Sequence, residues 1–213
     1  APQFSVAELH EAIAATRPDE LCLVFRDLRL TWAQVTDRTR RLANHLIAQG
    51  LGCTVERPHL AGHESGQDHL AIYLHNGNEY LECMLGGFKA RVAPFNVNYR
   101  YGPDEVHYLF DNADAEAVVF HGAFADLIDK VRGRLPLVKR FYMVPDVENA
   151  VVPSWAVNYN DIVSASKPDV TPAKPLSGDD MLFLYTGGTT GMPKGVMWRQ
   201  EDLFAVLGYG ANA

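Results

Sequence analysis

Apolar and polar positions along this chain follow two spacings, one typical of strands and one typical of helices. Short apolar runs predict strands at 21–25, 70–74, 92–95, 116–120, 140–144 and 180–185. Between them, apolar residues recur at helical spacing at 78–90, which predicts a helix, and another helix is predicted at 123–134. A helix is also expected to begin at Pro103, because proline is favoured at the first helical position and Asp104 and Glu105 follow in the first turn. Strands that alternate with helices in this way are typical of βαβ units. The pattern therefore predicts an α/β fold with a mainly parallel sheet and flanking helices.

The N-terminal region predicts two further helices whose ends are marked by capping residues. Two pairs have the spacing of a capping box, Ser5 with Glu8 and Thr31 with Gln34. The helices that follow them are expected to end near Arg17, before a proline, and near Gly50. Proline and glycine interrupt any regular spacing at 54–69 and 166–178, which are therefore predicted to be loops. A last helix is expected from about Glu201.

Composition and charge narrow the possible classes of protein. The 213 residues are 47% hydrophobic and 21% charged, which is typical of a folded chain rather than a disordered one. The net charge of -7 argues against a nucleic-acid partner, because phosphate contacts need clustered Lys and Arg. The apolar runs are too short to cross a bilayer, and no secretory signal is visible. We therefore expect a cytoplasmic protein without a transmembrane segment, in which Cys22, Cys53 and Cys83 are reduced thiols.

The stretch from Tyr185 to Gly195 reads Tyr-Thr-Gly-Gly-Thr-Thr-Gly-Met-Pro-Lys-Gly and carries the clearest chemistry in the sequence. Its glycines allow a turn whose N–H groups converge on one anion, its threonines add hydroxyl donors, and its lysine adds a positive charge. The spacing differs from that of a Walker A loop, in which Gly and Lys are adjacent and Ser or Thr follows. We therefore predict a polyphosphate site formed by Thr186, Gly187, Gly188, Thr189, Thr190, Gly191 and Lys194.

This stretch resembles the phosphate-binding motif of the adenylate-forming superfamily, which includes acyl-CoA synthetases, luciferases and peptide-synthetase adenylation domains. The family pattern is Tyr-Thr-Ser-Gly-Thr-Thr-Gly-x-Pro-Lys-Gly, and the chain departs from it at Gly187, which removes one hydroxyl donor. Further segments that resemble the family are 30–35, 80–91 and 94–101. The form Asn-Val-Asn-Tyr-Arg at 96–100 resembles that of fatty-acyl-CoA synthetases. Gly187 and the segment 195–202 are most similar to actinobacterial acyl-CoA ligases, including those of fatty acids and steroid side-chain acids.

The resemblance implies a two-step reaction of an AMP-forming acyl-CoA synthetase. A carboxylate attacks the α-phosphate of ATP, which is bound with Mg2+, and gives an acyl-adenylate and pyrophosphate. The thiolate of coenzyme A then displaces AMP and forms a thioester. The loop is expected to hold the β- and γ-phosphates, with Lys194 as an electrostatic partner rather than a proton donor. The sequence assigns no catalytic residue.

The same resemblance implies that residues 1–213 are the N-terminal portion of the large AMP-binding domain. The acidic motif for magnesium, the aspartate that holds the ribose, most of the acyl pocket and the C-terminal lid domain with its lysine are expected outside the chain. We therefore expect the chain alone to be inactive. Two alternatives remain open. One is another acyl- or aryl-adenylating enzyme that loads a carrier protein, and the other is a short nucleotide-binding protein without catalysis.

Four histidines lie close together in the sequence, His59, His63, His69 and His75, and such ligands could form a zinc site. Their spacing fits no compact finger pattern and no cysteine accompanies them, so we expect solvent-exposed loop histidines and no metal. Basic residues concentrate at 130–140 and are expected to face solvent, with peripheral membrane contact or contact with coenzyme A phosphates as the alternative. The sequence leaves open whether the protein forms a homo-oligomer.

Overall fold

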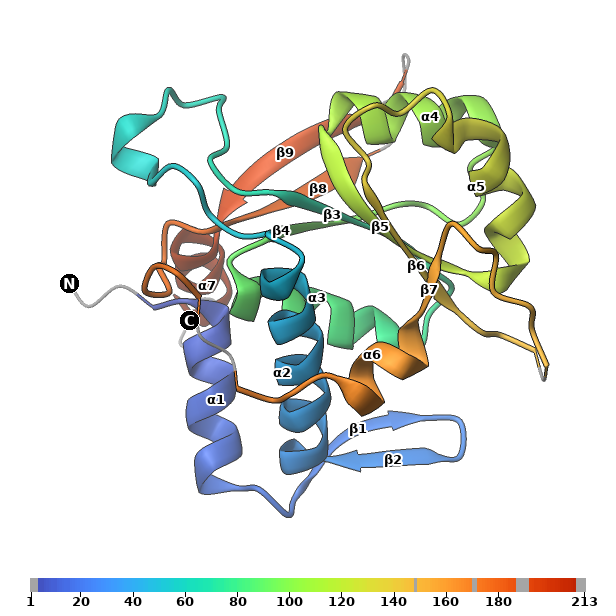
Figure 1. Cartoon of the computed structure of the whole chain (residues 1–213). Coiled ribbons are helices and arrows are strands. Elements are labelled where there is room, and N and C mark those ends of the chain that lie inside the picture. The colour runs from blue at the N-terminus through green and yellow to red at the C-terminus, as the bar shows by residue number, and fades with distance from the viewer. Residues whose placement is uncertain (1–3, 148, 170–171, 187–191, 210–213) are drawn as a thin grey trace.

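The computed structural model describes residues 4–147, 149–169, 172–186 and 192–209. Within these ranges seven strands form one sheet in the order β7-β6-β5-β3-β4-β8-β9. Neighbouring strands are parallel except β8 and β9, which are antiparallel. The strands are β3 (His69–Tyr73), β4 (Ala93–Asn96), β5 (Ala115–His121), β6 (Arg140–Val144), β7 (Val157–Asn158), β8 (Met181–Thr186) and β9 (Lys194–Arg199). The α/β fold with a mainly parallel sheet is thereby confirmed (Figure 1).

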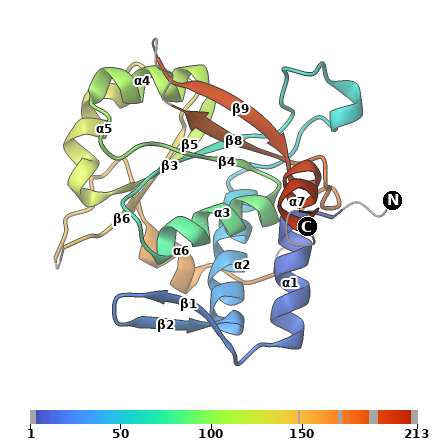
Figure 2. The ribbon, with the colours of Figure 1, turned by 180° about the vertical axis from the view of Figure 1, so that it is seen from behind.

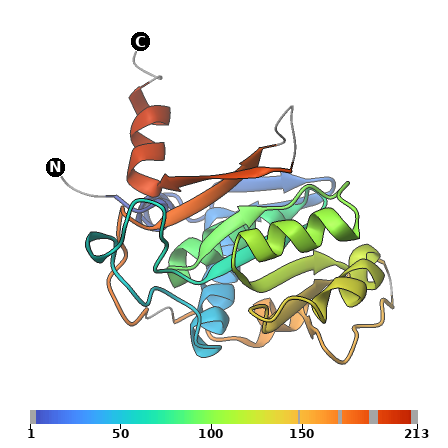
Figure 3. The same ribbon diagram turned by 90° about the horizontal axis from the view of Figure 1, so that it is seen from above.

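Helices cover both faces of this sheet (Figures 1 and 2). One face carries α2 (Trp32–Ala48), α3 (Asn78–Ala90) and α6 (Tyr159–Ala165), and the other carries α4 (Pro103–Asn112) and α5 (Ala125–Arg132). α1 (Val6–Thr16) packs beside α2 and α3, and α7 (Gln200–Tyr209) projects away from the sheet after β9 (Figure 3). None of the helices in the described ranges is both long and apolar enough to span a membrane.

The strand order explains why the helices divide between the two faces. α3 leads from β3 to its neighbour β4, whereas the next connection crosses back over β3 to reach β5 on the other side. Because crossovers between parallel strands are right-handed, a reversal of direction moves the connecting helix to the opposite face. α3 and α4 therefore lie on opposite faces of the sheet.

Alternation along the strands builds a separate core on each face. Leu70 and Ile72 of β3 pack with Leu42 of α2 on one side. Ala71 and Tyr73 pack on the other side, in the cluster that α4 and α5 complete. All five residues of β3 are buried, as expected for a strand that is covered on both faces of a parallel sheet.

Four regions depart from the sequence predictions. The strand at 21–25 is β1 (Leu21–Phe25), which pairs with an unpredicted strand, β2 (Leu28–Thr31), in a separate antiparallel hairpin. The sequence also predicted no element at 157–165, where β7 and α6 are too short to show a periodic pattern. The helix predicted at 123–134 consists of a 3-10 turn, η2 (Gly122–Phe124), followed by α5. The predicted loop at 54–69 contains a 3-10 turn, η1 (Arg57–His59), and its last residue belongs to β3.

A buried guanidinium ties the start of β8 to the rest of the molecule. Arg91 follows α3 in the left-handed conformation, with φ 58°, and is 2% exposed. Its Nε and Nη2 donate to the carboxylate of Asp180 at 2.9 and 2.7 Å. Its Nη1 and Nη2 donate to the carboxylate of Glu56 at 2.8 and 2.9 Å. Burial opposes the charge, but the hydrogen bonds that Arg91 donates to these two carboxylates prevail and raise its pKa.

Further polar contacts hold the base of the β8–β9 hairpin. The side-chain oxygen of Gln67 accepts the N–H of Met181 at 2.6 Å. The N–H of Gln200 donates to the carbonyl of Asp180 at 2.9 Å, and the side-chain oxygen of Gln200 accepts the N–H of Val6 at 2.8 Å. The start of α1, the segment before β3 and the end of β9 therefore meet at the first residues of β8.

We expect the substitution Arg91→Ala to lower the free energy of unfolding by about 3–5 kcal/mol, because it leaves the buried carboxylate of Asp180 without a partner. Urea denaturation measures the effect. The matched control is Arg17→Ala, which breaks an exposed pair with Glu20 and should cost less than about 1 kcal/mol. Equal effects of the two substitutions would contradict the role given to Arg91.

Glu116, the second residue of β5, is expected to make the stability of the chain depend on pH. The pKa of Glu116 is raised to about 7, mainly because the carboxyl is buried. The neighbouring Asp68 raises this pKa further, whereas the hydrogen bond from the backbone N–H of His69 lowers it. The folded chain therefore holds this proton more tightly than the unfolded chain, whose pKa is near 4.5. Between about pH 4.5 and about pH 7 the free energy of unfolding should fall as pH rises, by on the order of 1 kcal/mol.

The substitution Glu116→Gln should remove this component while it keeps an oxygen that can accept the N–H of His69. Urea midpoints of both proteins across this pH range provide the comparison. Parallel pH profiles for the wild type and the variant would count against the assignment.

Candidate functional site

The two arms of the β8–β9 hairpin bring together the first and last residues of the predicted polyphosphate site. In the antiparallel register Tyr185 lies opposite Gly195, and Thr186 lies opposite Lys194. Directly paired residues of an antiparallel ladder point to the same face, with Cβ atoms about 5 Å apart. Thr186 and Lys194 are both exposed. A hydroxyl donor and an ammonium are therefore presented side by side where the strands end.

The other five predicted ligands, Gly187, Gly188, Thr189, Thr190 and Gly191, lie outside the described residues. Their proposed contacts with phosphate remain sequence predictions. The hairpin register nevertheless fixes where the segment that contains them begins and ends, because Thr186 and Lys194 belong to adjacent strands.

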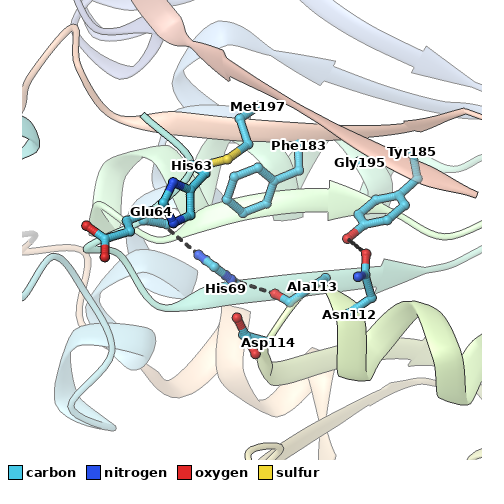
Figure 4. Close-up of a pocket in the computed structure, with 11 residues that line it drawn as sticks. His63, Glu64, His69, Asn112, Ala113, Asp114, Phe183, Tyr185, Gly195 and Met197 are labelled. Atoms are coloured by element: carbon cyan, nitrogen blue, oxygen red, sulfur yellow. Dashed lines mark hydrogen bonds between the residues drawn. The ribbon is translucent and has the colours of Figure 1, made fainter. Parts of the chain in front are cut away.

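Tyr185 occupies the face of the hairpin opposite to Thr186 and points toward α4. Its hydroxyl donates to Oδ1 of Asn112, the last residue of α4, at 3.0 Å (Figure 4). Its ring lies against Gly195, where a Cβ would be 2.8 Å from the ring Cζ. Burial raises the pKa of Tyr185 to about 12, so the phenol remains a hydrogen-bond donor at neutral pH. The glycine is therefore required by the close approach of the phenol ring.

A second contact joins α4 to the other arm of the hairpin. The hydroxyl of Tyr108 lies 3.5 Å from the carbonyl oxygen of Pro193, which is a long hydrogen bond. Pro193 is buried, whereas its neighbour Lys194 is exposed. α4 therefore contacts both arms of the hairpin on one face and leaves the opposite face, with Thr186 and Lys194, open to a ligand.

A cavity of about 410 Å³ lies beside Tyr185, between the hairpin, the end of α4 and the segment before β3. Its apolar wall includes Phe183, Tyr185 and Met197, and its polar wall includes Asn112 and Asp114 (Figure 4). Pockets that combine apolar walls with a few polar groups are typical of small-molecule sites.

The four histidines do not form one group. His69 was expected in an exposed loop, but it is the first residue of β3 and is buried. Its Nδ1 lies 2.6 Å from the carbonyl oxygen of Ala113 and its Nε2 lies 2.8 Å from Oγ of Ser65. Because a carbonyl can only accept, Nδ1 carries the proton and the serine hydroxyl donates to Nε2. Burial lowers the pKa of His69, which favours this neutral form.

His75 follows the carboxyl end of β3, whereas His59 and His63 lie in the segment before its amino end. The backbone N–H of His75 donates to Nδ1 of His121 at 2.9 Å, and the two imidazole rings stack with centroids 5.5 Å apart. Only His59 and His63 are therefore exposed histidines of the predicted loop. In the part of the chain that the structure describes, no group of three or more His, Cys, Asp or Glu side chains could hold a metal ion.

Sequence reasoning missed the contribution of α4 to the site. Asn112 and Tyr108 lie 73 and 85 residues before their partners in the hairpin, on a helix that was predicted only from its first proline and the acidic residues after it. No local pattern marks them, because their role depends on the return of the chain to pair β8 with β4.

Comparison with known proteins gives matches that cover nearly the whole chain. The family model described as AMP-binding enzyme matches residues 10–211. The chain is 44% identical over 209 residues to the medium-chain acyl-CoA ligase Mig of Mycobacterium avium, covering 98% of this chain and 38% of that protein. It is 36% identical over 210 residues to a 3-oxocholest-4-en-26-oate–CoA ligase of Rhodococcus rhodochrous, covering 98% of this chain and 35% of that protein. The chain thus spans little more than a third of the length of these relatives.

Among solved structures, the crystal structure of the anthranilate CoA ligase AuaEII in complex with anthranoyl-AMP is similar in fold. The TM-score is 0.82 at 21% sequence identity, and the match covers 97% of this chain and 37% of that one. The sheet and its flanking helices therefore have the arrangement found in that ligase.

The contact between Tyr185 and Gly195 predicts the effect of a methyl group. Gly195→Ala should displace the phenol ring, break its hydrogen bond to Asn112 and lower the free energy of unfolding by about 1–2 kcal/mol. Gly133→Ala is the matched control, because a Cβ there meets nothing within 4 Å and φ is -66°. The control should be neutral or stabilise the chain by up to about 1 kcal/mol in urea denaturation. A neutral Gly195→Ala substitution would contradict the close contact.

Proposed function

The chain belongs to the AMP-binding enzyme family, and on that premise we propose that residues 1–213 form the N-terminal portion of the adenylating domain of an acyl-CoA ligase. The β8–β9 hairpin is the polyphosphate site of this enzyme. The observation that carries the proposal is the hairpin register, in which Thr186 and Lys194 lie opposite each other at the two ends of the Gly/Thr segment. The names of both relatives, which are CoA ligases, support the choice of reaction.

In this reaction a carboxylate attacks the α-phosphate of ATP, the bond from the α-phosphorus to the bridging oxygen breaks, and pyrophosphate leaves with its electron pair. Coenzyme A then attacks the acyl carbon, and AMP leaves. The ammonium of Lys194 and the hydroxyl of Thr186 offset negative charge on the β- and γ-phosphates and hold them in line. Backbone N–H groups at Gly187, Gly188 and Gly191, with the hydroxyls of Thr189 and Thr190, complete the proposed set of donors.

ATP and coenzyme A are the substrates in this proposal, and Mg2+ accompanies the phosphates of ATP. The described residues contain no suitable group of metal ligands, so they do not fit a resident magnesium site. The chain's own contribution to the first step is therefore to bind and orient the phosphates.

The proposed acid substrate is a fatty acid or a steroid side-chain acid. This choice rests on the names of the two relatives, one a medium-chain acyl-CoA ligase and the other a 3-oxocholest-4-en-26-oate–CoA ligase. We place the reaction in the cytoplasm, where both ATP and coenzyme A are available. A carrier protein as the acceptor of the acyl group is not favoured by any described residue.

The proposed site predicts that the chain binds inorganic tripolyphosphate, measured by isothermal titration calorimetry in a buffer with Mg2+. Lys194→Ala should weaken this binding about 5- to 10-fold, because it removes a charge-assisted hydrogen bond at an exposed position. Thr186→Ala should weaken it about 2-fold, as expected for a neutral donor.

Lys130→Ala provides the control, because Lys130 is an exposed lysine on α5 and its loss changes the net charge equally. It should leave tripolyphosphate affinity unchanged. Equal affinities of Lys194→Ala and Lys130→Ala, or no binding by the wild type, would refute the proposed phosphate site.

A further inference from the structure

The outer end of the β8–β9 hairpin extends beyond the part of the sheet that holds it. In the described residues the register of β4 with β8 consists of one pair, Phe95 with Phe183, whereas β8 continues to Thr186. On its other side β8 pairs only with β9, which is the last strand of the sheet. The ladder that joins the hairpin to the parallel sheet therefore ends before Thr186 is reached.

Contacts with α4 occur where this ladder has ended. Tyr185 donates to Asn112 at 3.0 Å on one arm, and Tyr108 lies 3.5 Å from the carbonyl of Pro193 on the other. Tyr185 and Pro193 directly precede Thr186 and Lys194 in the chain. Each of the two described phosphate ligands is therefore adjacent to a residue that α4 contacts.

The hydrogen bond to Asn112 also determines where the phenol ring of Tyr185 can lie. One side of the ring faces Gly195, and the ring of Phe95 is 5.8 Å away between centroids. Tyr185 also lines the cavity of about 410 Å³, so packing alone leaves free space next to the ring. Figure 4 shows the phenol hydroxyl directed to Asn112 beside this cavity, so the hydrogen bond adds a directional constraint on the ring that packing does not supply.

We propose that Asn112 is a positioning residue for polyphosphate binding: through Tyr185 it holds the outer end of the hairpin so that Thr186 and Lys194 meet the phosphates together. Asn112 does not touch the ligand, and it lies outside the phosphate-binding motif. This inference rests on the proposed function, since it concerns the same hairpin. Tyr108 contributes less to the position of the hairpin than Asn112 does, because its hydrogen bond to the carbonyl of Pro193 is longer.

The test compares tripolyphosphate affinities of substituted chains by isothermal titration calorimetry. Asn112→Ala and Tyr185→Phe each remove the hydrogen bond and should weaken binding about 3- to 10-fold, and the double variant should be no weaker than either alone. Asn112→Asp keeps an oxygen acceptor and should bind nearly as tightly as the wild type. Tyr108→Phe should have a smaller effect than Asn112→Ala.

Two controls separate this role from a general loss of structure. Asn112 is exposed, so Asn112→Ala should leave the fold intact, which far-ultraviolet circular dichroism and urea midpoints can verify. Asn160→Ala removes another exposed amide, on α6, and should leave binding unchanged.

Each outcome decides between the two proposals. If Asn112→Ala binds as tightly as the wild type while Lys194→Ala is weakened, the positioning role is wrong and the phosphate site stands. Failure of Asn112→Asp to restore the affinity lost in Asn112→Ala, or additive losses in the double variant, would also overturn it. If neither Lys194→Ala nor Asn112→Ala changes the affinity, the phosphate site itself is wrong and the positioning role falls with it.

Discussion

A guanidinium that folding removes from water must be neutralised where it lies, and Arg91 meets this requirement with two carboxylates from different parts of the chain. Asp180 comes from the start of β8 and Glu56 from the segment before β3. Because a buried ion pair is favourable only when its geometry is satisfied, the three residues must arrive together. The end of α3, the start of β8 and the segment that carries Glu56 are thereby held in one relative position, and the β8–β9 hairpin begins at this point.

The two faces of the β8–β9 hairpin are held by different kinds of contact. On the face of α1 and α3, Leu182 and Leu184 join an apolar cluster with Phe88 and Leu85. On the face of α4 the contacts at the outer end are more specific, with the phenol of Tyr185 hydrogen-bonded to a helix-terminal amide. Apolar packing therefore holds the inner part of the hairpin, whereas a directional hydrogen bond is added at its outer part.

Repeated strand and helix patterns were enough to predict the parallel sheet, because its central strands contain short apolar runs, such as 70–73 in β3 and 117–120 in β5. The capping boxes at Ser5 and Thr31 likewise located two helices. The hairpin of β1 and β2 was missed in part because β2 is only four residues long and half of it is exposed. The location of His69 was wrong because its backbone pairs in β3 while its polar ring is satisfied by Ala113, a partner 44 residues away. Such contacts depend on tertiary structure and leave no local pattern.

The bond between the N–H of Val6 and the side chain of Gln200 joins residues 194 positions apart. A contact over so large a separation closes a longer loop, and so costs more chain entropy, than the pairing of β3 with β4 or the packing of α2 on α3. During synthesis the first helix must therefore wait for nearly all of these residues to leave the ribosome before its N-terminus gains its partner. The contact that closes the two ends of the fold on each other is thus available only after the seven described strands of the sheet have been made, because Gln200 follows β9 directly.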